Sequence, residues 1–176
     1  MQRILVAGFG GQGIVSMGKM LAYAGMKEDK HITSLPSYGP EMRGGTANSS
    51  VIISEREIAS PFISHPDTLI VMNQASLDKF SELVLNDGLI IANSSLVKIN
   101  SDIRAKTKVV EIPANDIAIE LGNLKVANMV ALGVFVRETA EIKLDSLETA
   151  LEKIFPPRRH NLIPINIKAL ERGFKI

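Results

Sequence analysis

The chain has 176 residues, of which 45% are hydrophobic and 22% are charged, values typical of a globular domain with a buried core. Twenty basic and nineteen acidic side chains leave a formal charge of +1, which argues against a nucleic-acid binder that works by neutralising phosphates. The sequence contains no cysteine, which excludes disulfides, thiol nucleophiles and thiolate ligation of zinc or iron–sulfur clusters.

The chain also shows no pattern for a metal site, a signal peptide or a membrane span. The histidines, His31, His65 and His160, are far apart and have no metal-ligand spacing. The apolar run at the N-terminus is too short for a signal peptide, and the longest later run, residues 126–136, is too short to cross a bilayer. We expect a cytoplasmic, soluble protein with one domain over residues 1–176, because no repeat or long linker divides it.

The first half of the chain predicts a β-α-β unit followed by a hairpin. The expected elements are a buried strand over 2–7, a helix from Ile14 to about Gly25, a strand over 31–36, a loop over 36–50, and a hairpin that pairs 51–53 with 58–60.

The second half continues the alternation of strands and helices. The expected elements are strands over 68–73, 87–94 and 108–114, helix 76–85, a buried helix 124–138 with Asn123 as N-cap, helix 145–155 with Asp145 and Glu148 as a capping box, and helix 166–172 ended by Gly173. This order predicts a three-layer α/β/α sandwich with a Rossmann-like sheet, which the hairpin insertion would make mixed. The apolar helix is expected to lie in the core rather than at a subunit interface.

Gly8, Gly10 and Gly13 give the G-x-G-x-x-G spacing between the first strand and the first helix. Such a turn brings backbone N–H groups close to a phosphate at the helix N-terminus. A dinucleotide site also needs an acidic residue about 20 positions further on, for the ribose. The corresponding segment, SLPSYGP, contains no carboxylate, which disfavours NAD. Two interpretations remain: an anion site completed by another molecule or chain, or tight packing around an empty turn.

A second glycine-rich loop, PSYGPEMRGGTANS, carries Glu41, Arg43, Gly44 and Gly45. Arginine is suited to phosphate or carboxylate, and the glycines let a partner approach the backbone. If strands 2–7 and 31–36 are adjacent and parallel, both glycine loops leave the sheet at the same edge. Glu41 is the only acid–base candidate there, and no catalytic triad can be assembled. We therefore expect a binding or assembly surface, with no catalytic residue in this chain.

The two motifs together, GFGGQGIVSMGKMLA and LPSYGPEMRGGTANSSVIIS, resemble the gamma subunit of the thiamine-dependent 2-oxoacid:ferredoxin oxidoreductases and domain III of pyruvate:ferredoxin oxidoreductase. The resemblance continues through TLIVMNQASLDKF, DGLIIANSS and NLKVANMVALGVF. The segment SYGPEMRGGTAN is similar to the 2-oxoglutarate and branched-chain 2-oxoacid types. The resemblance implies a hetero-oligomer that converts a 2-oxoacid, CoA and oxidised ferredoxin into acyl-CoA, carbon dioxide and reduced ferredoxin.

Within such a complex, the resemblance implies that thiamine diphosphate lies on alpha and beta subunits and iron–sulfur clusters on a ferredoxin-like delta subunit or on beta. This chain would hold no cofactor alone and would be inactive alone. It would contribute assembly surface and part of the CoA or cofactor site. The positions that match the motifs are Gly8, Gly10, Gly11, Gln12, Gly13, Ser37, Tyr38, Gly39, Glu41, Arg43, Gly44 and Gly45.

Two alternatives stay open. The chain is a free-standing NAD(P)- or flavin-binding oxidoreductase if the G-x-G-x-x-G turn alone decides its function. It is a purely structural assembly subunit if neither loop touches a small molecule. The basic run PPRRHN, residues 156–161, is expected to be a solvated turn, with contact to CoA phosphates or to an acidic ferredoxin as the other interpretation.

Overall fold

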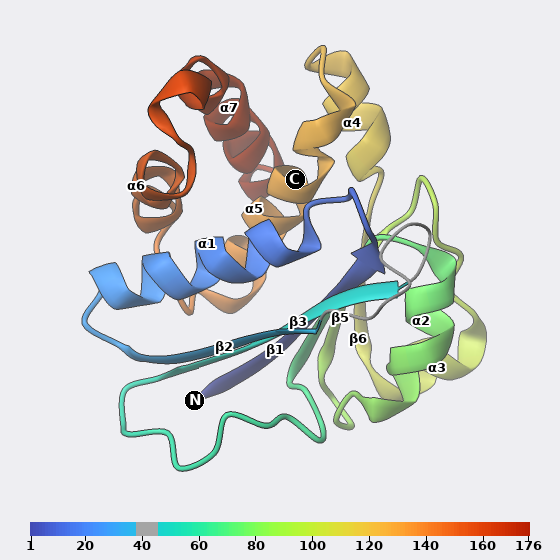
Figure 1. Ribbon diagram of the computed structural model, residues 1–176. Helices are drawn as coiled ribbons and strands as arrows, with labels where there is room; N and C mark the ends of the chain where they lie inside the picture. Colours follow the sequence, from blue (N-terminus) through green and yellow to red (C-terminus); the bar gives the residue numbers. More distant parts are fainter. Residues whose placement is uncertain (38–45) are drawn as a thin grey trace.

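The computed structural model describes residues 1–37 and 46–176 (Figure 1). Its strands are β1 (Gln2–Phe9), β2 (His31–Ser37), β3 (Thr46–Ser54), β4 (Thr68–Val71), β5 (Leu89–Asn93) and β6 (Lys108–Ile112). Its α-helices are α1 (Ile14–Lys27), α2 (Gln74–Phe80), α3 (Ser101–Lys106), α4 (Ala114–Glu120), α5 (Ala127–Thr139), α6 (Leu144–Ile154) and α7 (Ile163–Phe174). Short 3₁₀ turns are η1 (Ser81–Leu83), η2 (Leu124–Val126) and η3 (Pro157–Leu162). None of the helices in these ranges is long and apolar enough to span a bilayer.

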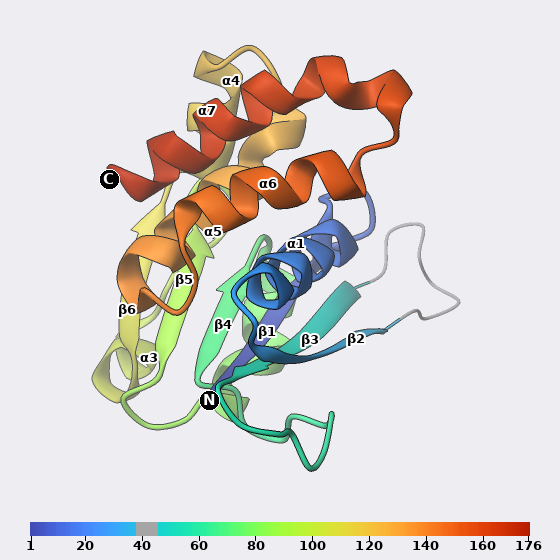
Figure 2. The same cartoon turned by 90° about the vertical axis from the view of Figure 1, so that its left-hand side faces the viewer.

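The strands form one sheet in the order β2-β3-β1-β4-β5-β6. Strands β1, β4, β5 and β6 are parallel, whereas β3 runs antiparallel to both β1 and β2. Helices α2 and α3 cover one face, and α1 and α5 cover the other, with α6 and α7 packed outside them (Figures 1 and 2). The predicted three-layer α/β/α sandwich with a mixed, Rossmann-like sheet is confirmed.

The predicted hairpin between 51–53 and 58–60 is wrong, because residues 55–60 form no strand. Instead β3 pairs along its length with β2, from His31 opposite Ser54 to Ser37 opposite Asn48. A nine-residue strand with a neighbour on each side is more stable than an isolated three-residue hairpin. Strands β1 and β2 are therefore parallel, as expected, but β3 separates them.

The core consists of two apolar clusters, one on each face of the sheet. Alternate residues of β1 supply both: Ile4 and Val6 belong to the larger cluster, and Leu5 and Ala7 to the smaller, as the period of two in a strand requires. Helix α5 is buried from Ala127 to Val136. The expectation that this apolar segment lies in the core is therefore confirmed.

Two helix ends differ from the sequence-based expectation. Helix α6 begins at Leu144, and its N-cap position, Lys143, makes no side-chain cap hydrogen bond. The predicted capping box is wrong, because Asp145 lies inside the first turn and accepts a 2.9 Å hydrogen bond from Lys27 of α1. Gly173 does not end α7, since it lies within the helix. Asn123 does act as an N-cap: its side chain accepts from the Lys125 N–H at 3.0 Å in the turn before α5.

Arg3 at the start of β1 holds Asp67, which directly precedes β4. The Arg3 guanidinium donates two hydrogen bonds of 2.9 Å to the two carboxylate oxygens, and the Arg3 backbone N–H donates a third at 2.8 Å. Burial alone would raise the pKa of Asp67, but the hydrogen bonds and charge of Arg3 outweigh burial and lower that pKa below its usual value.

We expect Asp67→Asn to lower the free energy of unfolding by about 1–2 kcal/mol at pH 7. Because the pKa of Asp67 is lower in the folded state, the stabilisation is present above the unfolded pKa of about 3.9 and disappears as the pH falls through the folded pKa. Urea unfolding of both proteins between neutral and acid pH measures the difference. A difference that stays constant to about pH 2 would contradict this assignment.

Candidate functional site

The glycine turn joins β1 to α1 through a backbone conformation that residues with a Cβ atom rarely adopt. Gly11 has φ +96° and Gly13 has φ +77°, the left-handed region that favours glycine. Gly13 is the N-cap of α1, and its carbonyl accepts from the Met17 N–H at 2.9 Å. The first turn of α1 carries no acidic residue. No carboxylate from this turn therefore competes for the N-terminal N–H groups of α1, and these groups can bind an anion.

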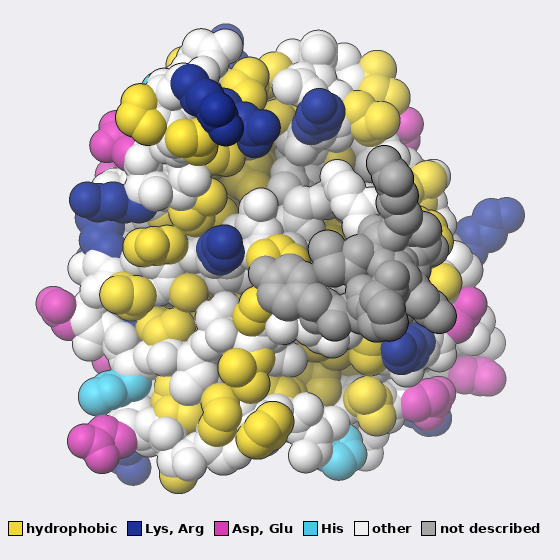
Figure 3. Space-filling view, in the orientation of Figure 1, with side chains coloured by type: hydrophobic (Ala, Val, Ile, Leu, Met, Phe, Trp, Pro, Cys, Tyr) yellow, Lys and Arg dark blue, Asp and Glu magenta, His cyan; other side chains and the backbone are white. Residues whose placement is uncertain are grey.

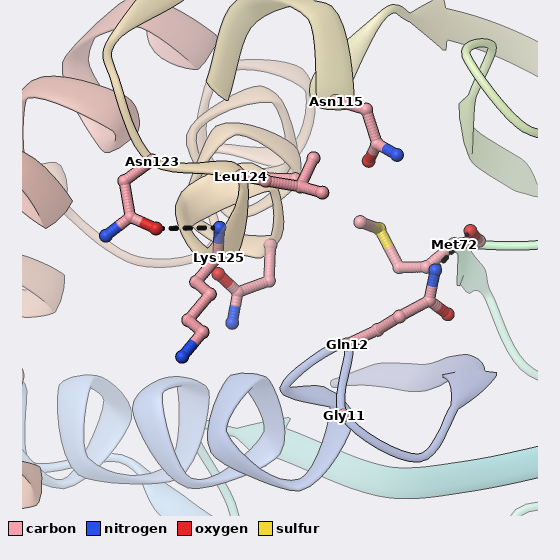
Figure 4. A pocket seen from close by; sticks show the side chains of 9 residues that line it. Gly11, Gln12, Met72, Asn115, Asn123, Leu124 and Lys125 are labelled. Atoms are coloured by element: carbon pink, nitrogen blue, oxygen red, sulfur yellow. Dashed lines mark hydrogen bonds between the residues drawn. The ribbon is translucent and has the colours of Figure 1, made fainter. Parts of the chain in front are cut away.

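The side chain of Gln12 fixes this turn to the ends of two strands. Its Oε1 accepts from the Phe9 N–H at 2.6 Å and from Asn73 Nδ2 at 3.3 Å, while its Nε2 donates to the Met72 carbonyl at 3.0 Å (Figure 4). Both ends of the amide are therefore used inside the protein. Gln12 was predicted to contact a cofactor. In the structure its side-chain amide holds the glycine turn in place.

Gln12→Ala is expected to lower the free energy of unfolding by about 1–3 kcal/mol, because the mutation removes three hydrogen bonds and leaves the Phe9 N–H without this acceptor. Chemical denaturation followed by circular dichroism measures the change. A midpoint and slope equal to those of the parent protein would show that the amide does not hold the turn.

Two adjoining cavities open beside the turn, with volumes of about 350 and 240 Å³. Gly11, Asn123, Lys125 and Asn128 line both. The larger cavity lies between the glycine turn, the end of β4 and the segment that leads into α5. In Figure 4, Met72 and Gln12 face Asn115 and Leu124 across it. The smaller cavity reaches from Gly13 along α1 toward η3, where Arg159 lines it.

Asn128, near the start of α5, contacts the glycine turn directly. It is only 7% exposed, and its Oδ1 accepts from the Met129 N–H at 2.9 Å. A Cβ atom on Gly13 would lie 2.3 Å from Asn128 Nδ2, so the close approach itself requires glycine. Among the described residues Nδ2 of Asn128 has no hydrogen-bond acceptor, and Asn128 lines both cavities. Its position in an otherwise apolar run, residues 126–136, is the signal that sequence reasoning missed.

The charged side chains that line the cavities are basic. Lys125 borders both cavities and Arg159 the smaller one, and both residues are exposed. In Figure 3, Lys and Arg side chains stand at the rim of a hollow with hydrophobic walls. The N-terminus of α1 also reaches this hollow. Together these groups favour a phosphate or carboxylate. No cluster of three metal-ligating side chains occurs in residues 1–37 and 46–176.

The structure places one part of the predicted site and leaves the other part untested. Gly8, Gly10, Gly11, Gln12 and Gly13 all lie in or beside the turn, and Ser37 ends β2. Gly8 lies opposite Ala47 and Ser37 opposite Asn48 on β3, so β1 and β2 end at the same sheet edge, as expected. The remaining predicted residues, Tyr38, Gly39, Glu41, Arg43, Gly44 and Gly45, lie outside the described residues.

Comparison with known proteins identifies relatives that are similar to this chain over almost its whole length. Ketoisovalerate oxidoreductase subunit VorA of Methanothermobacter thermautotrophicus is 36% identical over 172 residues, which are 97% of this chain but 35% of VorA. The chain thus spans about a third of that relative. 2-oxoglutarate synthase subunit KorC of Methanocaldococcus jannaschii is 32% identical, with 99% of this chain and 93% of KorC covered.

Solved structures agree with these sequence relationships. The gamma subunit of a keto/oxoacid ferredoxin oxidoreductase from Geobacter sulfurreducens superposes with a TM-score of 0.83 at 28% identity, covering 99% of this chain and 97% of the other. The family model described as pyruvate ferredoxin/flavodoxin oxidoreductase matches residues 3–176. The chain therefore belongs to the pyruvate ferredoxin/flavodoxin oxidoreductase family.

Proposed function

We propose that this chain is the gamma subunit of a thiamine-dependent 2-oxoacid:ferredoxin oxidoreductase, which forms acyl-CoA, carbon dioxide and reduced ferredoxin. The relatives named as ketoisovalerate oxidoreductase and 2-oxoglutarate synthase subunits support this class and favour a branched-chain 2-oxoacid or 2-oxoglutarate as substrate. The observation that carries the proposal is a basic cavity at a glycine turn that has no acid–base or nucleophilic constellation among its lining residues.

In this proposal the redox chemistry takes place on other subunits. Thiamine diphosphate belongs to alpha and beta subunits, and the iron–sulfur clusters to a ferredoxin-like delta subunit or to beta. The sequence of this chain has no cysteine to ligate a cluster. The chain works in the cytoplasm as one domain over residues 1–176, and it supplies assembly surface and part of the CoA site.

CoA is the proposed ligand because its phosphates match the donors at the turn. Lys125 and Arg159 supply positive charge, and the N-terminus of α1 supplies backbone N–H groups. Asn128 Nδ2 provides a further donor that is already held in place by burial. The proposal extends to the second motif, from Ser37 to Gly45, because the chain enters it at the same sheet edge.

The structure does not support the alternative of a dinucleotide site, because no carboxylate among the described residues stands where the ribose would bind. A ribose-binding carboxylate belongs at the end of the strand that follows the glycine-turn helix, and β2 ends in Pro36 and Ser37. No comparison supports a free-standing NAD(P)- or flavin-dependent enzyme.

Reduction of a viologen dye, dependent on 2-oxoacid and CoA, tests the proposal. The reconstituted complex should reduce the dye, whereas neither the isolated chain nor the partner subunits without it should do so at a comparable rate. Dye reduction by the isolated chain, or full CoA-dependent activity of the partners without it, would contradict the proposal. Comparing 2-oxoglutarate with 2-oxoisovalerate in the same assay identifies the substrate type.

A further inference from the structure

Strand β2 is one edge of the sheet, and it differs from the opposite edge, β6. The sequence of β2, HITSLPS, contains no lysine, arginine, aspartate or glutamate over seven residues. The five-residue strand β6, KVVEI, carries Lys108 and Glu111. Short length, charged side chains and proline are among the means by which sheet edges avoid pairing with other chains. The β2 edge is longer than β6, carries no charged side chain and has one proline, Pro36. Among the described residues β2 pairs with β3 alone.

Pro36 indicates which backbone groups of β2 point away from β3. Proline has no N–H, so within a sheet it takes a position whose nitrogen faces away from the neighbouring strand. Backbone groups alternate in direction along an antiparallel strand. Ile32 and Ser34 therefore direct both their N–H and C=O groups outward, and Pro36 directs its C=O outward.

These outward groups complement those of a second copy arranged antiparallel about a two-fold axis. With Ser34 on the axis, the two Ser34 residues exchange two hydrogen bonds. Each Ile32 N–H then meets the carbonyl of Pro36 in the other copy, which adds two more. The missing proline N–H leaves only the Ile32 carbonyl of each copy without a donor. The edge is therefore self-complementary in this register, and no charged side chain of β2 is buried by it.

Helix α1 covers the sheet beside β2 on the face to which Ile32 points, since a Cβ atom on Gly25 of α1 would lie 2.3 Å from Ile32 Cδ1. Tyr23 and Met26 on α1 are 43% and 60% exposed, whereas Leu35, 40% exposed, points to the opposite face of the sheet because side chains alternate along a strand. Tyr23 and Met26 also line a groove of about 230 Å³ between α1 and α6, whose walls are mostly apolar but include Lys27 and Lys153. Figures 1 and 2 place β2 and α1 on the side that Figure 3 views, where hydrophobic and uncharged side chains occupy the strip along β2.

The dimensions of this surface suit a pair of copies. A seven-residue strand is about 24 Å long and a 14-residue helix about 21 Å long. The strand and the helix form two layers, each about 10 Å thick. A face about 20 Å wide and as long as the strand therefore measures on the order of 500 Å² per copy. A two-fold pair would then bury about 1,000 Å², the lower limit for a specific interface.

We propose that the β2 edge, together with the outer face of α1, is a self-association surface on which a second copy of this chain adds its β2 strand to the sheet. Two copies would form a continuous sheet across the axis. This surface is separate from the glycine-turn cavities, and the inference does not rest on the proposed function.

Sedimentation velocity of the full chain across a wide concentration range tests the inference. The mass should rise from 19.1 kDa toward twice that value. Leu35→Lys should raise the dissociation constant about tenfold or more, since it brings a charge to the pairing edge. Ser34→Pro should weaken the dimer as well, because it removes the Ser34 N–H, which points away from β3 and would donate to the second copy.

Leu83→Lys is the matched control, because Leu83 is also 40% exposed but lies in η1, outside this surface. It should dimerise like the parent protein, with circular dichroism and melting temperature confirming the fold of each variant. A parent chain that stays monomeric throughout, a dimer that survives both β2 substitutions, or equal weakening by Leu83→Lys would overturn the inference.

Discussion

Gly133→Ala is expected to lower the free energy of unfolding by about 2–3 kcal/mol. A Cβ atom at this position of α5 would lie 2.1 Å from the Leu170 carbonyl oxygen and 2.8 Å from the Phe174 nitrogen of α7. Both atoms belong to the backbone, so no side-chain rotation relieves the clash, and the helices must separate. Gly173 makes the reciprocal contact, with a Cβ 2.0 Å from the Val130 carbonyl oxygen.

The sign of this effect separates packing from helix propensity. Inside an isolated helix, alanine is more favourable than glycine by about 1 kcal/mol. Propensity alone would therefore make the variant more stable than the parent protein. Equilibrium unfolding in guanidinium chloride measures the difference, and an unchanged or increased stability would show that α5 and α7 do not need this close approach.

The sequence predicted well those features that depend on local patterns. The glycine turn was identifiable because Gly8, Gly10 and Gly13 follow an apolar strand and precede a helical repeat. The sequence also indicated that β1 and β2 run parallel and end at the same end of the sheet, although the expectation that they are adjacent was wrong. Asn123 was identifiable as a cap because a polar residue stands directly before an apolar run.

Features that depend on distant contacts could not be predicted in the same way. The pairing of β3 is set by β1 and β2 on either side of it, so the local alternation around residues 51–60 indicated the wrong hairpin. Gly173 had the local pattern of a helix end, and only the position of α5 shows why a glycine is needed inside α7.

The candidate site illustrates the same limit. Asn128 and Lys125 lie far along the chain from the glycine turn, and only folding brings them to its cavities. Arg159 belongs to the basic run 156–161, for which a solvated turn was expected and contact with CoA phosphates was the other interpretation; its position beside the smaller cavity also depends on the fold. The short helices α3 and α4 were not predicted, because six or seven residues contain too few turns for a clear helical period. Helix α4 matters here, since Asn115 from its first turn lines the larger cavity.

In the reconstituted complex, replacing both Lys125 and Arg159 by alanine is expected to raise the KM for CoA by about ten- to a hundredfold. The two substitutions remove the basic groups that line the cavities at the turn. The value of kcat at saturating CoA should change little, because the proposed reaction takes place on the thiamine-binding subunits. Such a pattern indicates lost ground-state binding rather than lost chemistry.

Arg158→Ala is the matched control for this experiment. Arg158 is exposed and adjacent in sequence to Arg159, but it does not line either cavity. Its removal takes away one positive charge from the same turn without altering the site. It should leave the KM for CoA within about twofold of the parent complex, as expected for an exposed charge outside the binding site.

The apparent affinity of the intact complex for CoA therefore tests the central claim most directly. The account predicts a KM for CoA that rises in the Lys125→Ala, Arg159→Ala complex and not in the Arg158→Ala complex, with kcat and subunit composition preserved in both. An unchanged KM for CoA in the intact double variant would contradict a role for these cavities in binding CoA, and would favour a purely structural subunit.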